Sequence, residues 1–535
     1  MHKTGADREA FYTVRDELRW HRVFFLCLIG VTGLRILFLY LFPYDLSPDE
    51  AYYWDWSRHL SWGYYSKPPM VAWLIALSTS LFGATEFGVR LPATILGTCT
   101  LMGLYVVGFR MFDARTGFFA ALVFFVTIGS AVSSMIMTID APLLCFWAMS
   151  MVLVWQAWQS SATAEPGGPA LLWWTIAGAV AGLGLLSKQT MVAFTLGTIL
   201  FLVVNARTRR LLGSLEPYLF LAVQISLIFP VLAWNQQHGW VTLQHTAHHF
   251  ETSSRGMIPN FKTFFELLAT QAGVVTPIIF VLAILVSTCF FWKFIKGLLL
   301  KQRRWKGMRE RETFLLFIGL LPLAAIFLLS LRQRINANWP APFYLSLGVL
   351  LSAWAMGKTR CNGWADRLKG FFPPGIYLGL FLVVLFYLLP CFMGLLGLNG
   401  SKFDPTVRLR GWHELGAEAA ELIRGFPEPD KTFVVARRRQ TVSELAFYLP
   451  KQPEVYRWNG MERRVTTQYE LWPGPVDKKG WDALIIIGKD KFLMKDLVAC
   501  FEQVQFIKQI DIPLGHGTKR SFMAYRGIEM KHWAE

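Results

Sequence analysis

Charged side chains are scarce in this chain of 535 residues: Asp, Glu, Lys and Arg make up 17% of it, against about 25% in a soluble globular protein. Cysteine is also scarce, with seven residues and no CxxC pair, so neither a disulfide framework nor a metal knuckle is indicated. Apolar side chains take their place, at 54% of residues. This composition excludes a cytosolic enzyme, a disordered protein and a secreted disulfide scaffold, and predicts a polytopic membrane protein with a soluble tail.

The net charge of +17 lies mostly outside the C-terminal tail. Residues 399–535 hold 22 Lys and Arg against 18 Asp and Glu, so +13 of the total belongs to the membrane part and its short loops. A nucleic-acid-binding protein would carry its basic residues as a patch on a soluble face. We interpret the excess as a signal of membrane topology and expect no nucleic-acid partner.

A membrane-spanning helix needs about 20 apolar residues, and about eleven stretches are candidates. They are residues 23–42, 91–110, 117–137, 141–158, 170–187, 190–206, 216–234, 266–292, 313–331, 340–357 and 372–396. With this assignment the basic N-terminal segment and the four most basic loops all fall on one side of the membrane, the cytoplasmic side. The tail then lies in the periplasm of a bacterium. Residues 70–83 are too short to span, and we expect them to form a helix on the outer membrane surface.

The tail reads as a small α/β domain. Residues 431–437, 482–487, 506–512 and 521–526 have the composition of strands, and residues 441–449 have that of a helix. The predicted fold is therefore mainly α, a polytopic membrane protein with about eleven transmembrane helices, interfacial helices in the first outer loop and a small soluble α/β domain. We place a transmembrane domain at residues 1–398 and a periplasmic domain at residues 399–535.

Two acidic positions in predicted outer loops are candidates for chemistry. Asp49 and Glu50 follow Pro48 at a predicted helix start, where carboxylates also cap free N–H groups. The aromatic residues that follow would desolvate a carboxylate and suit it to general-base chemistry, although they are also typical of an interfacial belt. Asp140 lies between two long apolar runs, where a carboxylate is expensive and indicates function, unless it caps the helix ahead of Pro142.

Cations occur in three predicted outer loops: Lys67 before two prolines, Lys188 in the middle of a long apolar region, and Arg332 with Arg334. The positive-inside rule disfavours cations on that side of the membrane. Lys67 has a simpler explanation as a contact to lipid phosphates. Cations and carboxylates together predict a sugar transfer from a lipid phosphate, because cations neutralise the leaving phosphate while a single carboxylate deprotonates the acceptor. Such a single displacement inverts the anomeric centre.

Histidines gather in the segment WNQQHGWVTLQHTAHHF. Residues 245, 248 and 249 would share one helix face, which is one pattern of a metal site. No HExxH glutamate accompanies them, and a hydrogen-bonding role is the simpler interpretation. His245 is the metal-ligand candidate.

Five segments, taken in order, resemble a known family. They are SPDEAYYWDWSRHLSWGYYSKPPMVAW in the first outer loop, TIDAPLLCFWA (138–148), GLGLLSKQT (182–190), WNQQHGW (234–240) and NANWPAPFY (336–344). Together they are similar to bacterial membrane glycosyltransferases related to protein O-mannosyltransferases, and functionally to the lipid A aminoarabinose transferase, of the type C glycosyltransferase fold.

The resemblance implies a polyprenyl-phosphate sugar donor used on the periplasmic face. By position Asp49 matches the essential acid of the family, Asp140 matches a second acid, and Lys67 and Lys188 match lysines that contact the donor phosphate. The family places a metal-binding Glu at the position of Ser66, which speaks against a bound divalent metal here even though His245 would offer another ligand.

We therefore predict an inverting glycosyltransferase of the bacterial inner membrane. Its donor is a sugar linked to polyprenyl phosphate, and its acceptor is lipid A or another envelope glycolipid. Asp49 is the base, Glu50 and Asp140 orient it, and Lys67, Lys188, Arg332 and Arg334 hold phosphate. A protein O-glycosyltransferase and a transporter of lipid-linked sugar are the alternatives.

Overall fold

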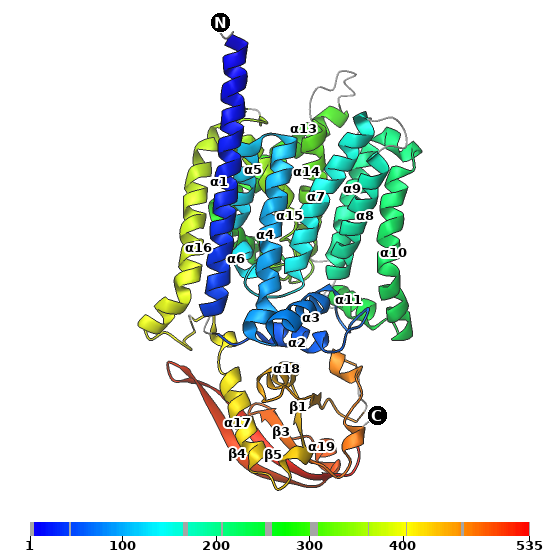
Figure 1. Cartoon of the computed structure of the whole chain (residues 1–535), viewed down its shortest axis with the longest axis vertical. Helices are drawn as coiled ribbons and strands as arrows, with labels where there is room; N and C mark the ends of the chain where they lie inside the picture. Colours follow the sequence, from blue (N-terminus) through cyan, green and yellow to red (C-terminus); the bar gives the residue numbers. More distant parts are fainter. Residues whose placement is uncertain are drawn as a thin grey trace. The chain divides into compact units, whose positions relative to one another are not determined.

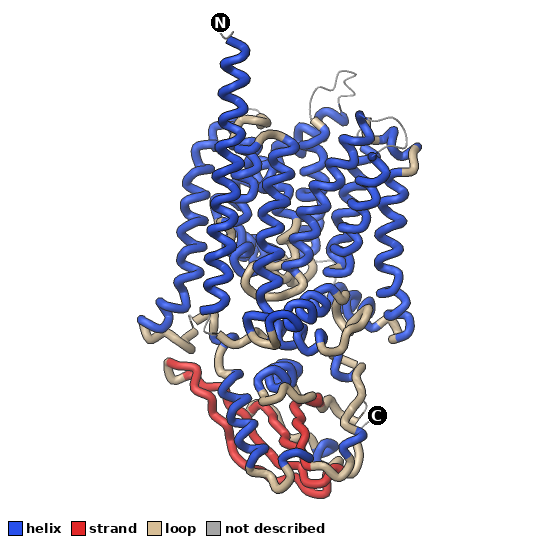
Figure 2. Tube along the Cα trace, in the orientation of Figure 1, coloured by secondary structure: helices blue, strands red, loops and turns tan. Residues whose placement is uncertain are grey.

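The computed structural model describes residues 5–41, 44–163, 169–204, 207–251, 259–299, 309–361, 363–402, 404–461 and 465–533. The chain divides into two compact units. Unit 1 comprises residues 1–40, 91–238 and 246–387, and unit 2 comprises residues 41–90, 239–245 and 388–535. Residues 41–90, the predicted first outer loop, thus group with the C-terminal region, and the domain boundary at residues 398/399 stays a prediction. Helices build unit 1, whereas unit 2 combines helices with a sheet (Figures 1 and 2).

Unit 1 is helical, and some of its helices continue into unit 2. Its helices are α1 (Gly5–Leu41), α4 (Glu86–Met111), α5 (Ala114–Phe125), α6 (Ile128–Ser133), α7 (Asp140–Thr163), α8 (Pro169–Ser187), α9 (Val192–Val204), α10 (Glu216–Gln237), α11 (Val241–Glu251), α12 (Phe261–Val275), α13 (Pro277–Leu299), α14 (Glu310–Ser330), α15 (Phe343–Ala355) and α16 (Phe372–Leu395). By length and composition, eight helices in the described ranges can cross a membrane: α1, α4, α7, α8, α10, α13, α14 and the helical segment ending with α16. The predicted mainly α, multi-pass membrane fold is confirmed.

The predicted number of eleven spans is not confirmed, because two of the apolar stretches are interrupted. In the stretch 117–137, α5 ends at Phe125 and the hydroxyl of Thr127 caps the short helix α6. In the stretch 266–292, Thr276 has a positive φ of 72° and separates α12 from α13. Three more apolar helices, at residues 114–125, 189–204 and 343–355, are shorter than the eight.

Basic loops of unit 1 meet at one end of its helices. The guanidinium of Arg311, at the start of α14, donates a hydrogen bond of 2.6 Å to the carbonyl of Met111, where α4 ends. Lys358, after α15, forms an ion pair with Asp113 in the turn before α5. Because the helices alternate in direction, the start of α7, the end of α8 and the loop after α14 lie at the opposite end of this unit.

Unit 2 contains a five-stranded sheet in the order β2-β1-β3-β5-β4. Its elements are α2 (Pro48–Ser57), α3 (Met70–Phe82), α17 (Trp412–Arg424), β1 (Thr432–Ala436), α18 (Arg439–Tyr448), β2 (Val455–Arg457), β3 (Asp482–Gly488), α19 (Lys495–Ala499), β4 (Phe501–Gly515) and β5 (Thr518–Met530). The strands β1, β2 and β3 are parallel, and β5 pairs antiparallel with both β3 and β4. The predicted α/β tail and the predicted helix at 70–83 are both present.

The chain reverses direction across the sheet after β1. From β1 it passes through α18 to β2 on one side, and it then returns to form β3 on the other side of β1. The connections therefore diverge at the carboxyl ends of β1 and β3. At the far side of the sheet, the edge strand β4 carries bulges between Phe506 and Lys508 and between Pro513 and Gly515.

Candidate functional site

The start of α7 in unit 1 holds a buried carboxylate with two partners. Asp140 accepts a hydrogen bond of 2.7 Å from the ammonium of Lys188 and one of 2.6 Å from the side-chain amide of Asn338. Its own backbone N–H donates to the hydroxyl of Thr138 at 3.3 Å. The side chains of Asp140 and Lys188 are 11% and 7% exposed, so the ion pair is shielded from solvent.

Breaks in helices bring these groups together. Lys188 has an extended backbone (φ −159°, ψ 137°) between α8 and the turn that leads to α9, so its side chain leaves the helix end rather than a helix face. Asn338 lies in the turns between α14 and α15, and Gln271 of α12 steadies that segment by donating 2.9 Å to the carbonyl of Ala337. The ion pair and the hydrogen bond from Asn338 therefore join three separate parts of unit 1.

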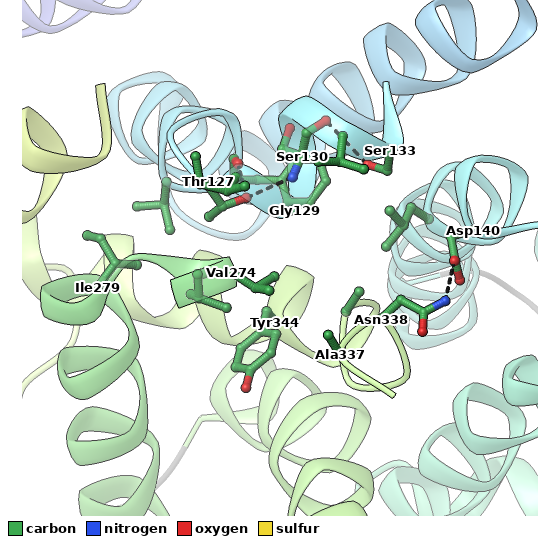
Figure 3. A pocket seen from close by; sticks show the side chains of 18 of the residues that line it. Thr127, Gly129, Ser130, Ser133, Asp140, Val274, Ile279, Ala337, Asn338 and Tyr344 are labelled. Carbon is green, nitrogen blue, oxygen red and sulfur yellow. Dashed lines mark hydrogen bonds between the residues drawn. The ribbon is translucent and has the colours of Figure 1, made fainter. Parts of the chain in front are cut away.

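A cavity of about 330 Å³ opens beside Asp140. Figure 3 shows Asp140 and Asn338 at one end, with Val274 and Ile279 toward the other. Most of the lining is apolar, from α5, α6, α12, α13 and α15. Tyr344 lines it too, and its hydroxyl is buried with no hydrogen-bond partner in the described part of the chain. An apolar cavity that ends at an ion pair suits an amphiphile whose polar group carries charge.

Unit 2 presents the other predicted acid, Asp49, at the start of α2. Its carboxylate lies 2.8 Å from the guanidinium of Arg439, the first residue of α18, and its side chain is 57% exposed. Arg439 also lies over the ring of Tyr52, with 4.5 Å from the guanidinium carbon to the ring centroid. Asp49 is thus accessible and held by a single cation in the described structure of unit 2.

Glu50 next to it has a structural role. Its carboxylate accepts from the backbone N–H of Ser47 at 2.9 Å, while the hydroxyl of Ser47 accepts from the N–H of Glu50, which forms a capping box. Arg90 donates two hydrogen bonds of 3.0 and 3.1 Å to the same carboxylate, and the side chains of Arg90 and Glu50 are 1% and 0% exposed. Glu50 therefore fixes the start of the helix that carries Asp49, without access to a substrate.

The aromatic residues after Asp49 do not wall in its carboxylate. Tyr52, Tyr53, Trp54 and Trp56 are buried in unit 2, where they pack α2 against its neighbours, while Asp49 points to Arg439. The side chain of Asp49 is 57% exposed, so these rings do not enclose it.

The remaining predicted cations differ in exposure. Lys67 is half-buried in the loop between α2 and α3 of unit 2. Arg332 is exposed, and the exposed Arg334 lies 3.9 Å from Glu266 of α12. Because Lys67 and Asp49 belong to unit 2 while Lys188 and both arginines belong to unit 1, their convergence around one phosphate stays a prediction.

The predicted metal site around His245 stays a prediction. His245 lies in α11 with its ring 4.9 Å from the ring of Tyr65. In the described residues, no group of three or more His, Cys, Asp or Glu side chains could hold a metal ion. The side chain of residue 249 lies outside the described residues. We derive no step through a metal.

A second cavity, of about 780 Å³, opens beside Asp49 in unit 2. We call it the basic cleft. It is lined by Ser47, Pro48, Asp49, Arg408, Trp412, Arg438, Arg439, Gln440, Thr441, Gly488, Lys489, Asp490, Lys519, Arg520, Ser521 and Phe522. The first outer loop and the C-terminal region thus build one cavity, whose cations outnumber its carboxylates.

Sequence reasoning gave no role to three residues that shape the site: Arg90, Asn338 and Arg439. Arg90 is a charged residue at the start of an apolar helix, and its charge alone could have marked it. Asn338 lies in the segment NANWPAPFY, which carries part of the family resemblance. The partnership of Arg439 with Asp49 joins residues 390 positions apart and leaves no trace in the local sequence.

Several known proteins resemble this chain in sequence. Residues 66–234 match the family described as dolichyl-phosphate-mannose-protein mannosyltransferase. The chain is 28% identical over 332 residues to the lipid A galacturonosyltransferase RgtD of Rhizobium johnstonii, covering 62% of this chain and 65% of that relative. It is also 28% identical over 342 residues to an undecaprenyl phosphate-alpha-4-amino-4-deoxy-L-arabinose arabinosyl transferase of Pseudomonas aeruginosa, covering 62% and 58%. The alignments thus span less than two thirds of either relative.

A solved structure extends the likeness to nearly the whole chain. ArnT from Cupriavidus metallidurans bound to undecaprenyl phosphate superimposes with a TM-score of 0.57 at 16% identity, covering 94% of this chain and 98% of ArnT. The chain has the ArnT fold. The apo structure of ArnT gives the same result, with a TM-score of 0.56. The resemblance to membrane glycosyltransferases of the O-mannosyltransferase and lipid A aminoarabinose transferase type is confirmed.

Proposed function

We propose that this protein is an inverting glycosyltransferase that moves one sugar from a polyprenyl-phosphate donor to lipid A or another envelope glycolipid. The observation that carries this is the accessible carboxylate of Asp49, which Arg439 holds at the rim of the basic cleft. The relatives support the substrates, because their names specify lipid A and an undecaprenyl-phosphate-linked sugar.

Asp49 acts as the general base. It takes the proton of an acceptor hydroxyl as that oxygen bonds to the anomeric carbon, and the bond from this carbon to the phosphate oxygen breaks at the same time. The electron pair leaves with the phosphate, which needs no general acid. Lys67, Lys188, Arg332 and Arg334 bind the phosphate and stabilise its added charge.

Asp140 is a positioning residue in this scheme. Its ion pair with Lys188 and its hydrogen bond from Asn338 keep a cation at the polar end of the unit 1 cavity. The apolar remainder of that cavity suits the first isoprene units of the donor lipid. A donor phosphate would then share Lys188 with Asp140.

The protein resides in the bacterial inner membrane in this proposal, with its N-terminus in the cytoplasm and the domain at residues 399–535 in the periplasm. The meeting of basic loops at one end of unit 1 supports this orientation, because basic loops stay on the cytoplasmic side. Reaction groups at the opposite end then face the compartment in which lipid A is modified.

The test is transfer of a labelled sugar from undecaprenyl phosphate to lipid A by the purified chain in detergent. We expect Asp49→Asn to lower turnover by about 10²- to 10⁴-fold, the range for loss of a general base. Its exposed side chain predicts unchanged folding. Asp477→Asn, at a side chain 70% exposed in the same unit, is the matched control. Near-normal turnover by Asp49→Asn would remove Asp49 from the mechanism.

The same assay decides between the alternatives. Turnover in detergent, where no membrane separates two compartments, contradicts a transporter. Mass spectrometry of lipid A and of periplasmic proteins, from cells with and without the gene, separates a lipid acceptor from a protein acceptor. Loss of a sugar from proteins but not from lipid A would overturn the proposed acceptor.

A further inference from the structure

The basic cleft of unit 2 has more cations than a base at Asp49 requires. Six cationic side chains line it: Arg408, Arg438, Arg439, Lys489, Lys519 and Arg520. Two carboxylates, Asp49 and Asp490, face them. A concave surface with this imbalance attracts anions, because the summed field of its cations adds over the cavity.

The cleft occupies the position where open α/β sheets bind ligands. Ligands of such sheets lie outside the carboxyl ends of parallel strands, where the connections diverge to opposite sides. In unit 2 the connections diverge at β1 and β3. Arg438 and Arg439 follow the end of β1, and Lys489 and Asp490 follow the end of β3. The fold therefore directs these side chains to one crevice.

The first turn of α18 adds backbone donors to the same crevice. Arg438 is its N-cap residue and has no side-chain hydrogen bond to the helix. Gln440 and Thr441, in the first turn, line the cleft. Free N–H groups and the positive end of the helix dipole favour an anion at this position.

Some cations of the cleft have an acidic partner and others do not. Among the paired ones, Arg438 forms an ion pair with Asp490, and Lys519 lies 2.7 Å from Asp511. Arg408 and Lys489 are exposed, and neither forms an ion pair with any part of the chain that the structure describes.

Arg520, in the wall of the cleft, also has a donor group without an acceptor. Its guanidinium carbon lies 3.7 Å from the ring centroid of Trp412, and its Nη2 donates to the carbonyl of Val407 at 3.2 Å. Its Nη1 is buried and has no hydrogen-bond partner within the described ranges. A buried guanidinium nitrogen without an acceptor is expensive, and an anionic oxygen would satisfy it.

We propose that the basic cleft binds the anionic groups, phosphate or carboxylate, on the saccharide head of the acceptor, and so presents an acceptor hydroxyl to Asp49. This inference rests on the proposed function and adds an acceptor subsite in the C-terminal region to it. The same phosphate chemistry could come from the donor, so the experiment separates acceptor from donor.

The test measures dissociation constants of the full-length protein in detergent for three probes. These are lipid A with both phosphates, chemically dephosphorylated lipid A, and undecaprenyl phosphate. We expect Arg408→Ala/Lys489→Ala to weaken binding of phosphorylated lipid A by about tenfold or more, with little change for the other two probes. Arg424→Ala/Lys495→Ala removes the same charge from exposed positions of the unit outside the cleft, and should bind like the wild type. Arg408→Lys/Lys489→Arg should restore most of the affinity.

Three results would overturn the inference: unchanged affinity for phosphorylated lipid A, an equal loss for the dephosphorylated form, or a loss confined to undecaprenyl phosphate. The last would make the cleft a donor site. Binding does not require turnover, so the two proposals fail separately. Phosphate-dependent binding without any sugar transfer contradicts the proposed function alone, and transfer with phosphate-independent binding contradicts this inference alone.

Discussion

The two units treat their acidic residues in opposite ways. In unit 1, Asp140 is buried, with its two oxygens engaged by Lys188 and Asn338. In unit 2, Asp49 is 57% exposed and holds a single ion pair, with Arg439. Both carboxylates lie in the first turn of a helix.

The difference teaches that exposure separates a reacting group from a positioning group. A carboxylate that must take a proton needs a lone pair and an approach for the acceptor, which Asp49 has. Asp140 and Glu50 are instead buried, and their oxygens already accept hydrogen bonds from neighbouring cations.

The largest expected effect is on Asp140. Asp140→Ala leaves the ammonium of Lys188 buried without its partner, and breaking a buried pair lowers the free energy of unfolding by about 3–5 kcal/mol. Thermal unfolding of the purified protein in detergent, followed by Trp fluorescence, should show a clear fall in Tm.

The double variant Asp140→Ala/Lys188→Met removes both charges and should regain most of that stability. If the single variant melts like the wild type, the ion pair is not buried in the way described, and the contrast with Asp49 disappears.

An intermediate effect is expected at Glu444 in α18, a buried carboxylate whose charged neighbours include Arg520 and Arg90. It is fully buried, and neither of its oxygens has a hydrogen-bond partner in the described structure. Burial raises the pKa of Glu444 well above its ordinary value of 4.5, so the folded protein retains a proton that the unfolded chain releases. Its contribution to stability is present below pH 4.5 and is lost as the pH rises through the folded pKa.

Glu444→Gln cannot ionise and should escape this loss. We expect the variant to have a higher Tm than the wild type, and the difference should grow from about pH 5 to about pH 8. The corresponding gain in the free energy of unfolding should reach roughly 1–3 kcal/mol. Glu428→Gln, at an exposed side chain of the same unit, should follow the wild type at each pH. A Tm difference that shrinks with rising pH would contradict the raised pKa.

The smallest effect on stability is expected at Arg439. Its pair with Asp49 lies at the rim of a cleft, with side chains 25% and 57% exposed, and ion pairs with such access to solvent contribute about 1 kcal/mol or less. Arg439→Gln should therefore change the free energy of unfolding far less than Asp140→Ala in the same Tm measurement. A loss as large as that of Asp140→Ala would show that Asp49 is a positioning group as well.

Much of the fold follows from patterns in the sequence. Apolar length located the helices, and alternation with turn residues located β1, β3, β5 and part of β4. Hydropathy averages over a window, so it joined α12 to α13 across Thr276, where one residue of positive φ ends a helix. The strand β2 has three residues, too few for any alternation to register.

The candidate site was predictable in its residue types and not in its pairings. Unpaired charges in apolar surroundings marked Asp140 and Lys188, because burial makes them expensive. Which cation meets which carboxylate depends on tertiary contacts, as with Arg439 and Asp49 or Arg90 and Glu50. The exposure of a side chain depends on the same contacts. The sequence predicts aromatic rings around the Asp49 carboxylate, whereas its side chain is 57% exposed.

The edge of the sheet has a consequence for encounters with other molecules. A long border strand offers a row of backbone donors and acceptors to any extended peptide. In β4 the bulges break that row, Pro513 contributes no donor, and Lys508 lies 2.6 Å from Glu418 of α17 instead of extending along the edge. The β4 edge of unit 2 is therefore protected from backbone pairing with strands of other molecules. Recognition of other molecules is left to side chains on the other faces of the unit.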